Sequence, residues 1–236
     1  MANRLASALV VIGLLTGIAL AEEMHLDRMV AVVNRYVITE SEWQAQERFL
    51  ALLEGKSPAS IKLDDASLGR LMDRELILQQ IENVNFARIT PDEVAQQVHE
   101  LRQQSGAVDD KAWAEKLAEY GLVQDEFESF VADQTDVMRF IENRFRQNAR
   151  ATPEMVEEYY KQQFIPALLK NGAKPDGVPP LAQVREKIAR VLVEQRVDEM
   201  LSAWLESLRN QAHVRRVIHV GSGDSAQAGT GDSFDR

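Results

Sequence analysis

The chain has 236 residues, of which 45% are apolar, 27% are charged and none is cysteine. This length is enough for one or two domains with a buried core, and the lack of cysteine excludes disulfides, a thiol nucleophile and a cysteine-ligated metal site. With 27 basic and 37 acidic residues the net charge is −10, so we expect no nucleic-acid partner.

Residues 1–21 have the organisation of a secretory signal peptide. Arg4 supplies a positive charge, the segment from Leu5 to Ala21 has no charged residue, and it closes on Ala19-Leu20-Ala21, a small-x-small cleavage pattern. The alternative is an uncleaved membrane anchor, but these 17 residues include two glycines and are short for a bilayer of ~30 Å. We therefore predict cleavage, export to a periplasm and no stable membrane insertion.

Strand patterns occur near both ends of the remaining chain. Two β-branched runs between Asp27 and Thr39 flank Asn34, a residue that tolerates positive φ, so we predict a tight hairpin. The segment from His213 to Val220 alternates in part and holds the other strand pattern in the chain. We expect it to pair with the hairpin and tie the chain ends together, before a Gly- and Ser-rich disordered tail over residues 221–236.

Capping signals and apolar spacing predict a series of helices between these strands. Thr39 with Glu42, and Thr90 with Glu93, have the spacing of capping boxes, while glycines end several of the patterns. The predicted helices cover about 40–54, 66–83, 91–105, a short stretch around Trp113, 124–150, a stretch from 153, and 181–211.

The apolar faces of the two longest helices predict their packing. In the helix over 124–150, one stripe holds Phe127, Phe130, Val131, Val137, Met138, Ile141 and Phe145. Phe140 lies on the far side, which suggests a second contact surface or exposure. In the helix over 181–211 the stripe changes face partway, so we expect different neighbours at its two ends.

These patterns predict a mainly α fold, in which a multi-helix core carries a small β-sheet made by the N-terminal hairpin and a C-terminal strand. Four of the seven prolines fall between residues 164 and 180, so we expect a linker or irregular crossover there. The predicted parts are a helical module over 22–163, the linker over 164–180, and a helix and strand over 181–220 that complete the core.

The sequence contains no motif for catalysis, so we predict no catalytic residue, no metal site and no cofactor. The four histidines do not have metal-ligand spacing, and the acidic residues form surface patterns with lysine and arginine. Aromatic residues on the short or late helices are the candidates for binding apolar peptides, although each one alone is more often a core residue. They are Trp113, Tyr120, Phe140, Tyr159, Tyr160 and Phe164.

Several segments, in order, resemble the SurA family of periplasmic chaperones, which are parvulin-linked foldases. The opening Val30-Ala31-Val32-Val33-Asn34 with Val37-Ile38-Thr39 is the most specific, and the likeness extends to about Val220. It continues through Glu75–Gln80, Ile89–Val94, Gly121-Leu122 with Phe127, Thr152–Glu154 with Tyr159-Tyr160, and Val184–Ile188 with Trp204, Leu205 and Leu208. Such proteins normally carry a parvulin isomerase domain where this chain has only residues 164–180. The resemblance therefore implies a chaperone core without the catalyst.

The function expected from this resemblance is an ATP-independent holdase. It would bind unfolded outer-membrane or exported proteins in an apolar cradle formed by the N-terminal helices and the returning C-terminal helix. Two alternatives remain open: a structural or assembly partner of one envelope protein, in which exchange of the last helix gives a homodimer, and a peptidyl-prolyl isomerase.

Overall fold

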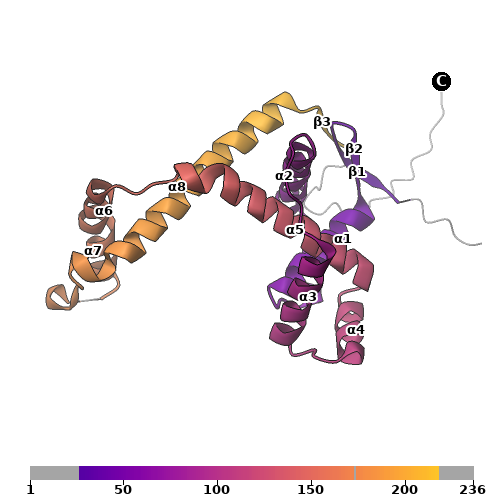
Figure 1. The fold of residues 1–236 in the computed structure, drawn as a ribbon, viewed down its shortest axis with the longest axis horizontal. Helices are drawn as coiled ribbons and strands as arrows, with labels where there is room; N and C mark the ends of the chain where they lie inside the picture. The colour runs from indigo at the N-terminus through magenta and orange to yellow at the C-terminus, as the bar shows by residue number, and fades with distance from the viewer. Residues whose placement is uncertain (1–26, 173, 218–236) are drawn as a thin grey trace, which may run out of the picture.

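The structure is a computed structural model that describes residues 27–172 and 174–217. The predicted signal peptide and the predicted tail lie outside the described residues. Within them the protein is mainly helical and carries one small antiparallel sheet, which confirms the predicted fold class (Figure 1).

The sheet joins the two ends of the described chain. Strands β1 (Met29–Val33), β2 (Tyr36–Thr39) and β3 (Val214–Arg216) lie in the order β2-β1-β3. Val33 pairs with Tyr36 in the hairpin and with Val214 in β3, both in antiparallel register. The predicted pairing of the C-terminal strand with the hairpin is confirmed, although β3 is shorter than expected and residues 218–220 lie outside the described part.

The first five helices form the main body. They are α1 (Glu40–Leu53), α2 (Asp65–Glu82), α3 (Pro91–Ser105), α4 (Asp110–Glu119) and α5 (Gln124–Phe145). The bounds of the first three agree closely with the predictions, because their caps are local signals. Helix α5 ends earlier than expected, where the chain tightens into the short 3-10 helix η2 (Arg146–Asn148) ahead of the Thr152-Pro153 helix start.

One of the two predicted capping boxes is complete. The Thr90 hydroxyl accepts from the backbone of Glu93, and the Glu93 carboxylate accepts from the backbone of Thr90. At the start of α1, the Thr39 side chain accepts from the backbone of Glu42, but the Glu42 carboxylate accepts from the Tyr36 hydroxyl at 2.7 Å. The reciprocal half of this box is therefore replaced by a contact with strand β2.

The core has two main parts on either side of α1. One part lies between α1, α3, α4 and α5, where the ring of Phe49 packs against that of Phe127 at 5.4 Å. The other lies beneath the sheet, where Trp43 packs near Leu68 and donates to the Ser67 hydroxyl at 3.0 Å. Helix α2 contacts α1, α5, α8 and β1, so its predicted central place is confirmed.

The buried face of α5 rotates along the helix. Its first half packs with α1 and α3, whereas its second half meets α2 and α8. As a result Phe140 is buried, with its ring 5.6 Å from that of Phe86 and 5.8 Å from that of Trp204. Met138, which the apolar stripe placed in the core, is 57% exposed. The second contact surface suggested by the position of Phe140 is therefore confirmed, and exposure, the alternative, is excluded. The placement of Met138 was wrong, because a single stripe assumes one set of neighbours for the whole helix.

Beyond α5 the chain forms an arm that points away from the sheet (Figure 1). It consists of α6 (Pro153–Tyr159), the π-helical turn η3 (Tyr160–Phe164), α7 (Ile165–Lys170), the 3-10 helix η4 (Pro175–Gly177) and the first half of α8 (Leu181–Gln211). The expected linker over 164–180 is thus helical as far as Lys170. Pro166 stands in the first turn of α7, directly after the π-helical turn η3.

Helix α8 has different neighbours at its two ends, as its changing apolar face predicts. In the arm Ile188 is buried and the helix packs on α6. Toward the sheet, Leu208 enters the core beneath β1 and Trp204 packs against the end of α5. The returning C-terminal helix therefore completes the core of the main body.

Candidate functional site

An apolar groove lies between α3 and α5, and two residues of α1 also line it; we call it the α3–α5 groove. Its volume is about 720 Å³, within the usual range for ligand sites in proteins. The lining residues are Phe49, Leu53, Gln97, Glu100, Leu101, Gln104, Val131, Gln134, Thr135, Met138, Arg139, Glu142 and Asn143.

The helical repeat explains why these residues share one surface. On α3 the lining positions are 97, 100, 101 and 104, and on α5 they follow the same three- and four-residue spacing from Val131 to Asn143. Each helix therefore offers one continuous stripe to the groove. Gly106, with φ of 77°, ends α3 in the left-handed conformation that glycine adopts without strain.

The floor of the groove is apolar and only partly covered. Phe49 is buried at its base, and its ring lies 5.3 Å from that of Phe130. Leu53 and Met138 stand at the surface, exposed by 37% and 57%. A methionine side chain is flexible and polarizable, so it adapts to apolar partners of different shape.

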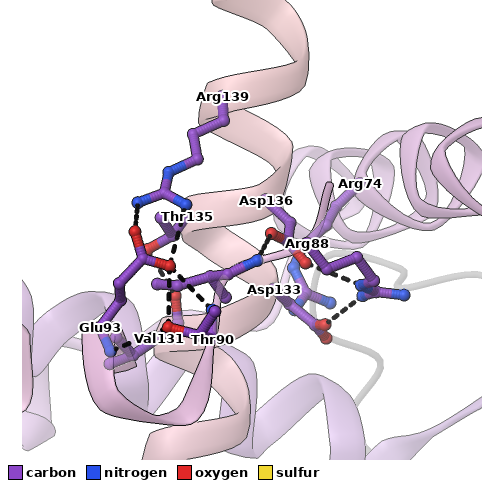
Figure 2. Close-up of polar contacts among 10 residues, drawn as sticks. Arg74, Arg88, Thr90, Glu93, Val131, Asp133, Thr135, Asp136 and Arg139 are labelled. Atoms are coloured by element: carbon purple, nitrogen blue, oxygen red, sulfur yellow. Dashed lines mark hydrogen bonds and ion pairs between the residues drawn. The ribbon is translucent and has the colours of Figure 1, made fainter. Parts of the chain in front are cut away.

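A polar network holds α3 and α5 in place on either side of the groove (Figure 2). Asp136 of α5 is 1% exposed, and its carboxylate accepts from Arg88 Nε at 2.8 Å and from the Ile89 backbone at 2.7 Å. Beside it, Asp133 pairs with Arg74 at 2.9 Å and with Arg88 at 3.3 Å. These bonds tie α2 and the start of α3 to α5.

Glu93 adds a second tie in the same network (Figure 2). Its carboxylate accepts from Arg139 at 2.8 Å and from the Thr90 backbone at 2.8 Å. The hydrogen bond from Arg139, followed by those from Thr90, lowers the pKa of Glu93 to about 2. The walls of the groove are therefore fixed by several bonds, while its apolar floor stays open.

A model of the SurA-like N-terminal domain family matches residues 4–141, which is more than half of the chain. The chain belongs to this family. A search among curated proteins finds no match. The matched segment of the SurA-like domain contains the hairpin, α1 to α4 and most of α5, so it includes most of the groove. The predicted family resemblance is confirmed, and residues 27–172 and 174–217 contain no parvulin domain.

Three of the predicted binding aromatics are core residues of the SurA-like domain. Trp113, Tyr120 and Phe140 are all buried. The Trp113 indole donates to Gln124 at 2.7 Å, and the Tyr120 hydroxyl donates to the backbone of Lys56 at 2.8 Å. Their polar groups are satisfied inside the protein, as is usual for buried aromatics. They do not form an open binding surface.

The other three predicted aromatics, Tyr159, Tyr160 and Phe164, lie on the arm and are partly exposed. The ring of Tyr160 stacks on that of Phe164 at 5.7 Å, and its hydroxyl donates to the Pro179 carbonyl at 2.8 Å. Met155 and Leu169, nearby in the chain, are also exposed. The arm thus carries partly exposed apolar side chains outside the matched SurA-like segment.

The groove itself was missed by the sequence-based predictions. Leu53 and Met138 had the spacing of core residues, and nothing local indicates that no other helix covers them. Gln104 and Asn143, which also line the groove, had the pattern of ordinary surface residues in the sequence. The signal that marks the site is an uncovered apolar stripe, and it exists only once the neighbouring helices are placed.

The described residues offer little sign of other chemistry. Residues 27–172 and 174–217 hold no group of three or more metal-ligating side chains. In the same part of the SurA-like chain, no helix has the length and apolar character needed to cross a bilayer.

Proposed function

We propose that the protein is an ATP-independent periplasmic holdase that binds unfolded outer-membrane or exported proteins in the α3–α5 groove. Membership of the SurA-like family supports a role of the periplasmic chaperone type. The observation that carries the proposal is the open apolar groove between walls held by buried polar bonds. Burial of client side chains there would supply free energy at ~25 cal/mol per Å², less the cost of ordering the client.

The arm extends the same proposal. Its partly exposed Tyr159 and Phe164 offer a second apolar surface to a client too long for the groove alone. Two weak contacts on one chain reinforce each other through effective concentration. The net charge of −10 would keep such a carrier soluble with apolar surface exposed. We further propose that the protein acts without catalysis.

The direct test is suppression of aggregation of an unfolded β-barrel protein, followed by light scattering after dilution from urea. We expect the purified chain from residue 22 onward to suppress scattering at a small molar excess. The decisive variant is Met138→Glu, which places a charge in the groove at an exposed position and so spares the fold. Val108→Glu is the matched control, because Val108 is also 57% exposed and lies outside the groove.

The proposal expects Met138→Glu to lose most of the suppression and Val108→Glu to keep it. Equal activity of the two variants would show that clients do not use the groove. A wild-type chain without effect at several-fold excess would contradict the holdase role altogether.

A further inference from the structure

Four of the residues that line the α3–α5 groove carry carboxamides. Gln97 and Gln104 stand on α3, and Gln134 and Asn143 stand on the facing side of α5; we call these four the rim carboxamides. Two turns of helix, ~10 Å, separate the pair on α3. Both walls of the groove therefore carry uncharged polar groups beside the charged Glu100, Arg139 and Glu142.

The rim carboxamides retain most of their hydrogen-bonding capacity. The Gln97 carboxamide bonds the Thr135 hydroxyl at 2.6 Å, and the same hydroxyl donates to the Val131 carbonyl at 2.8 Å. Gln104, Gln134 and Asn143 form no side-chain hydrogen bond with any residue of 27–172 or 174–217. Each carboxamide offers two donors and one acceptor oxygen, which is the complement of a peptide group.

Two of the three charged residues that line the groove are paired with opposite charges of the protein. Arg139 binds Glu93, and Glu142 pairs with Arg146. Glu100 accepts from Gln96 at 3.1 Å. Glu100 has no cationic partner among the described residues, so an acidic client side chain is the one that would lose its hydration in the groove without gaining a free counter-charge. The groove is therefore least suited to acidic segments.

The dimensions of the groove suit a short stretch of extended chain. Its α5 wall runs from Val131 to Asn143, a helical rise of ~18 Å. An extended chain covers that distance with about five residues at ~3.3 Å each. A helical client would have satisfied its own backbone groups, and the rim carboxamides would then have nothing to bind.

We propose that the α3–α5 groove binds the main chain of an extended client segment without acidic residues, with the rim carboxamides bonding its peptide groups and the floor taking its apolar side chains. This inference rests on the proposed holdase function and specifies how the groove selects its clients. Recognition through the main chain would make binding tolerant of sequence, because every segment carries the same peptide groups.

The test compares two labelled peptides by fluorescence anisotropy with the chain from residue 22 onward. The first is a ten-residue peptide of alternating Leu or Phe and Ser or Thr, without charge. The second has the same side chains, but its central peptide nitrogens are methylated at alternate positions, which removes donors. Loss of one or two main-chain hydrogen bonds should weaken binding by about tenfold or more.

A variant with altered rim carboxamides separates the loss of hydrogen bonds to the groove from any effect of methylation on the conformation of the free peptide. This triple variant combines Gln104→Met, Gln134→Met and Asn143→Leu. The new side chains have a similar size, but they remove the hydrogen-bond donors and acceptors of the walls. We expect the two peptides to bind this variant with nearly equal affinity. The three residues make no internal side-chain hydrogen bond, so the variant should fold, and single Gln104→Met should show part of the effect.

Three results would overturn the inference, and they are distinguishable. Equal binding of both peptides by the wild-type chain would refute main-chain recognition and leave the proposed holdase function standing. If methylation weakened binding equally in the wild type and in the triple variant, groups other than these carboxamides would bind the main chain. Failure of the wild-type chain to bind either peptide would refute the proposed function of the groove as well.

Discussion

Asn34 and His213 bind each other through two hydrogen bonds, although 179 residues separate them. The Asn34 backbone donates to the His213 carbonyl at 2.9 Å, and the His213 backbone donates to Asn34 Oδ1 at 2.9 Å. Asn34 Nδ2 also donates to Gln79 Oε1 at 2.7 Å. One turn residue therefore joins the hairpin, helix α2 and the entry to strand β3.

This junction predicts the effect of changing Asn34. Asn34 has φ of 58°, so Asn34→Gly keeps the backbone relaxed while removing the side-chain bonds. We expect the free energy of unfolding to fall by about 1–3 kcal/mol, measured in urea. Asn34→Asp keeps the acceptor for His213 and loses the donor to Gln79, so its loss should be smaller. A glycine variant as stable as the wild type would mean that this junction contributes nothing.

Trp204 predicts how strongly the C-terminal helix supports the main body. Its ring lies 5.8 Å from that of Phe140 and 5.6 Å from that of Phe145, and the Arg144 guanidinium lies 4.7 Å from its centroid. Trp204→Ala should lower the free energy of unfolding by about 2–4 kcal/mol. Val191→Ala, on the exposed part of the same helix, is the control and should change it by less than about 1 kcal/mol. Similar losses in the two variants would argue against a shared core.

The buried contacts of Asp136 predict how much the free energy of unfolding depends on the polar network beside the groove. Asp136→Asn keeps the shape of the side chain but removes the charge that faces Arg88 in a buried site. We expect a loss of about 2–4 kcal/mol in the free energy of unfolding. Asp133→Asn, where the carboxylate is partly exposed, should lose much less. The prediction fails if the two variants unfold at the same urea concentration.

Glu75 predicts a pH dependence of stability. Burial, opposed by the hydrogen bond from Gln79 and assisted by nearby Glu42, raises the pKa of Glu75 to about 7. The unfolded chain has the ordinary value of about 4.3, so the folded state takes up this proton first as the pH falls. The charged Glu75 therefore lowers the free energy of unfolding by its full amount above pH ~7, and this destabilisation disappears as the pH falls from ~7 to ~4.3.

The corresponding test compares Glu75→Gln with the wild type in urea at several pH values. The variant should be more stable at pH 8, because it removes a buried charge and keeps a polar group for Gln79. Its advantage should shrink as the pH falls to about 5, where Glu75 is protonated in the folded wild type. Arg74 and Glu82 also influence this carboxyl, but both remain in the variant. An advantage that does not change with pH would disprove the raised pKa.

The helix ends and the pairing of the chain ends could be predicted because their causes are local. The Thr90 and Glu93 pair caps α3 with its own side chains, and Gly106 ends it through its own backbone freedom. The β-branched runs around Asn34 predicted a hairpin, and the segment that forms β3 was the other strand pattern in the chain with which the hairpin could pair. The family could be predicted for the same reason, since the opening segment of the hairpin carries its most specific residues.

The candidate site could not be predicted, because exposure depends on neighbours that are distant in sequence. Met138 and Phe140 are two residues apart on α5 and equally apolar, yet Phe140 is covered by α8 and Met138 is not. By itself the sequence determined the helices, the sheet and the family, through caps, turns and periodicity. Only the tertiary structure decided which apolar faces remain open, because the packing of α8 on one side of α5 leaves the opposite side as the wall of a groove.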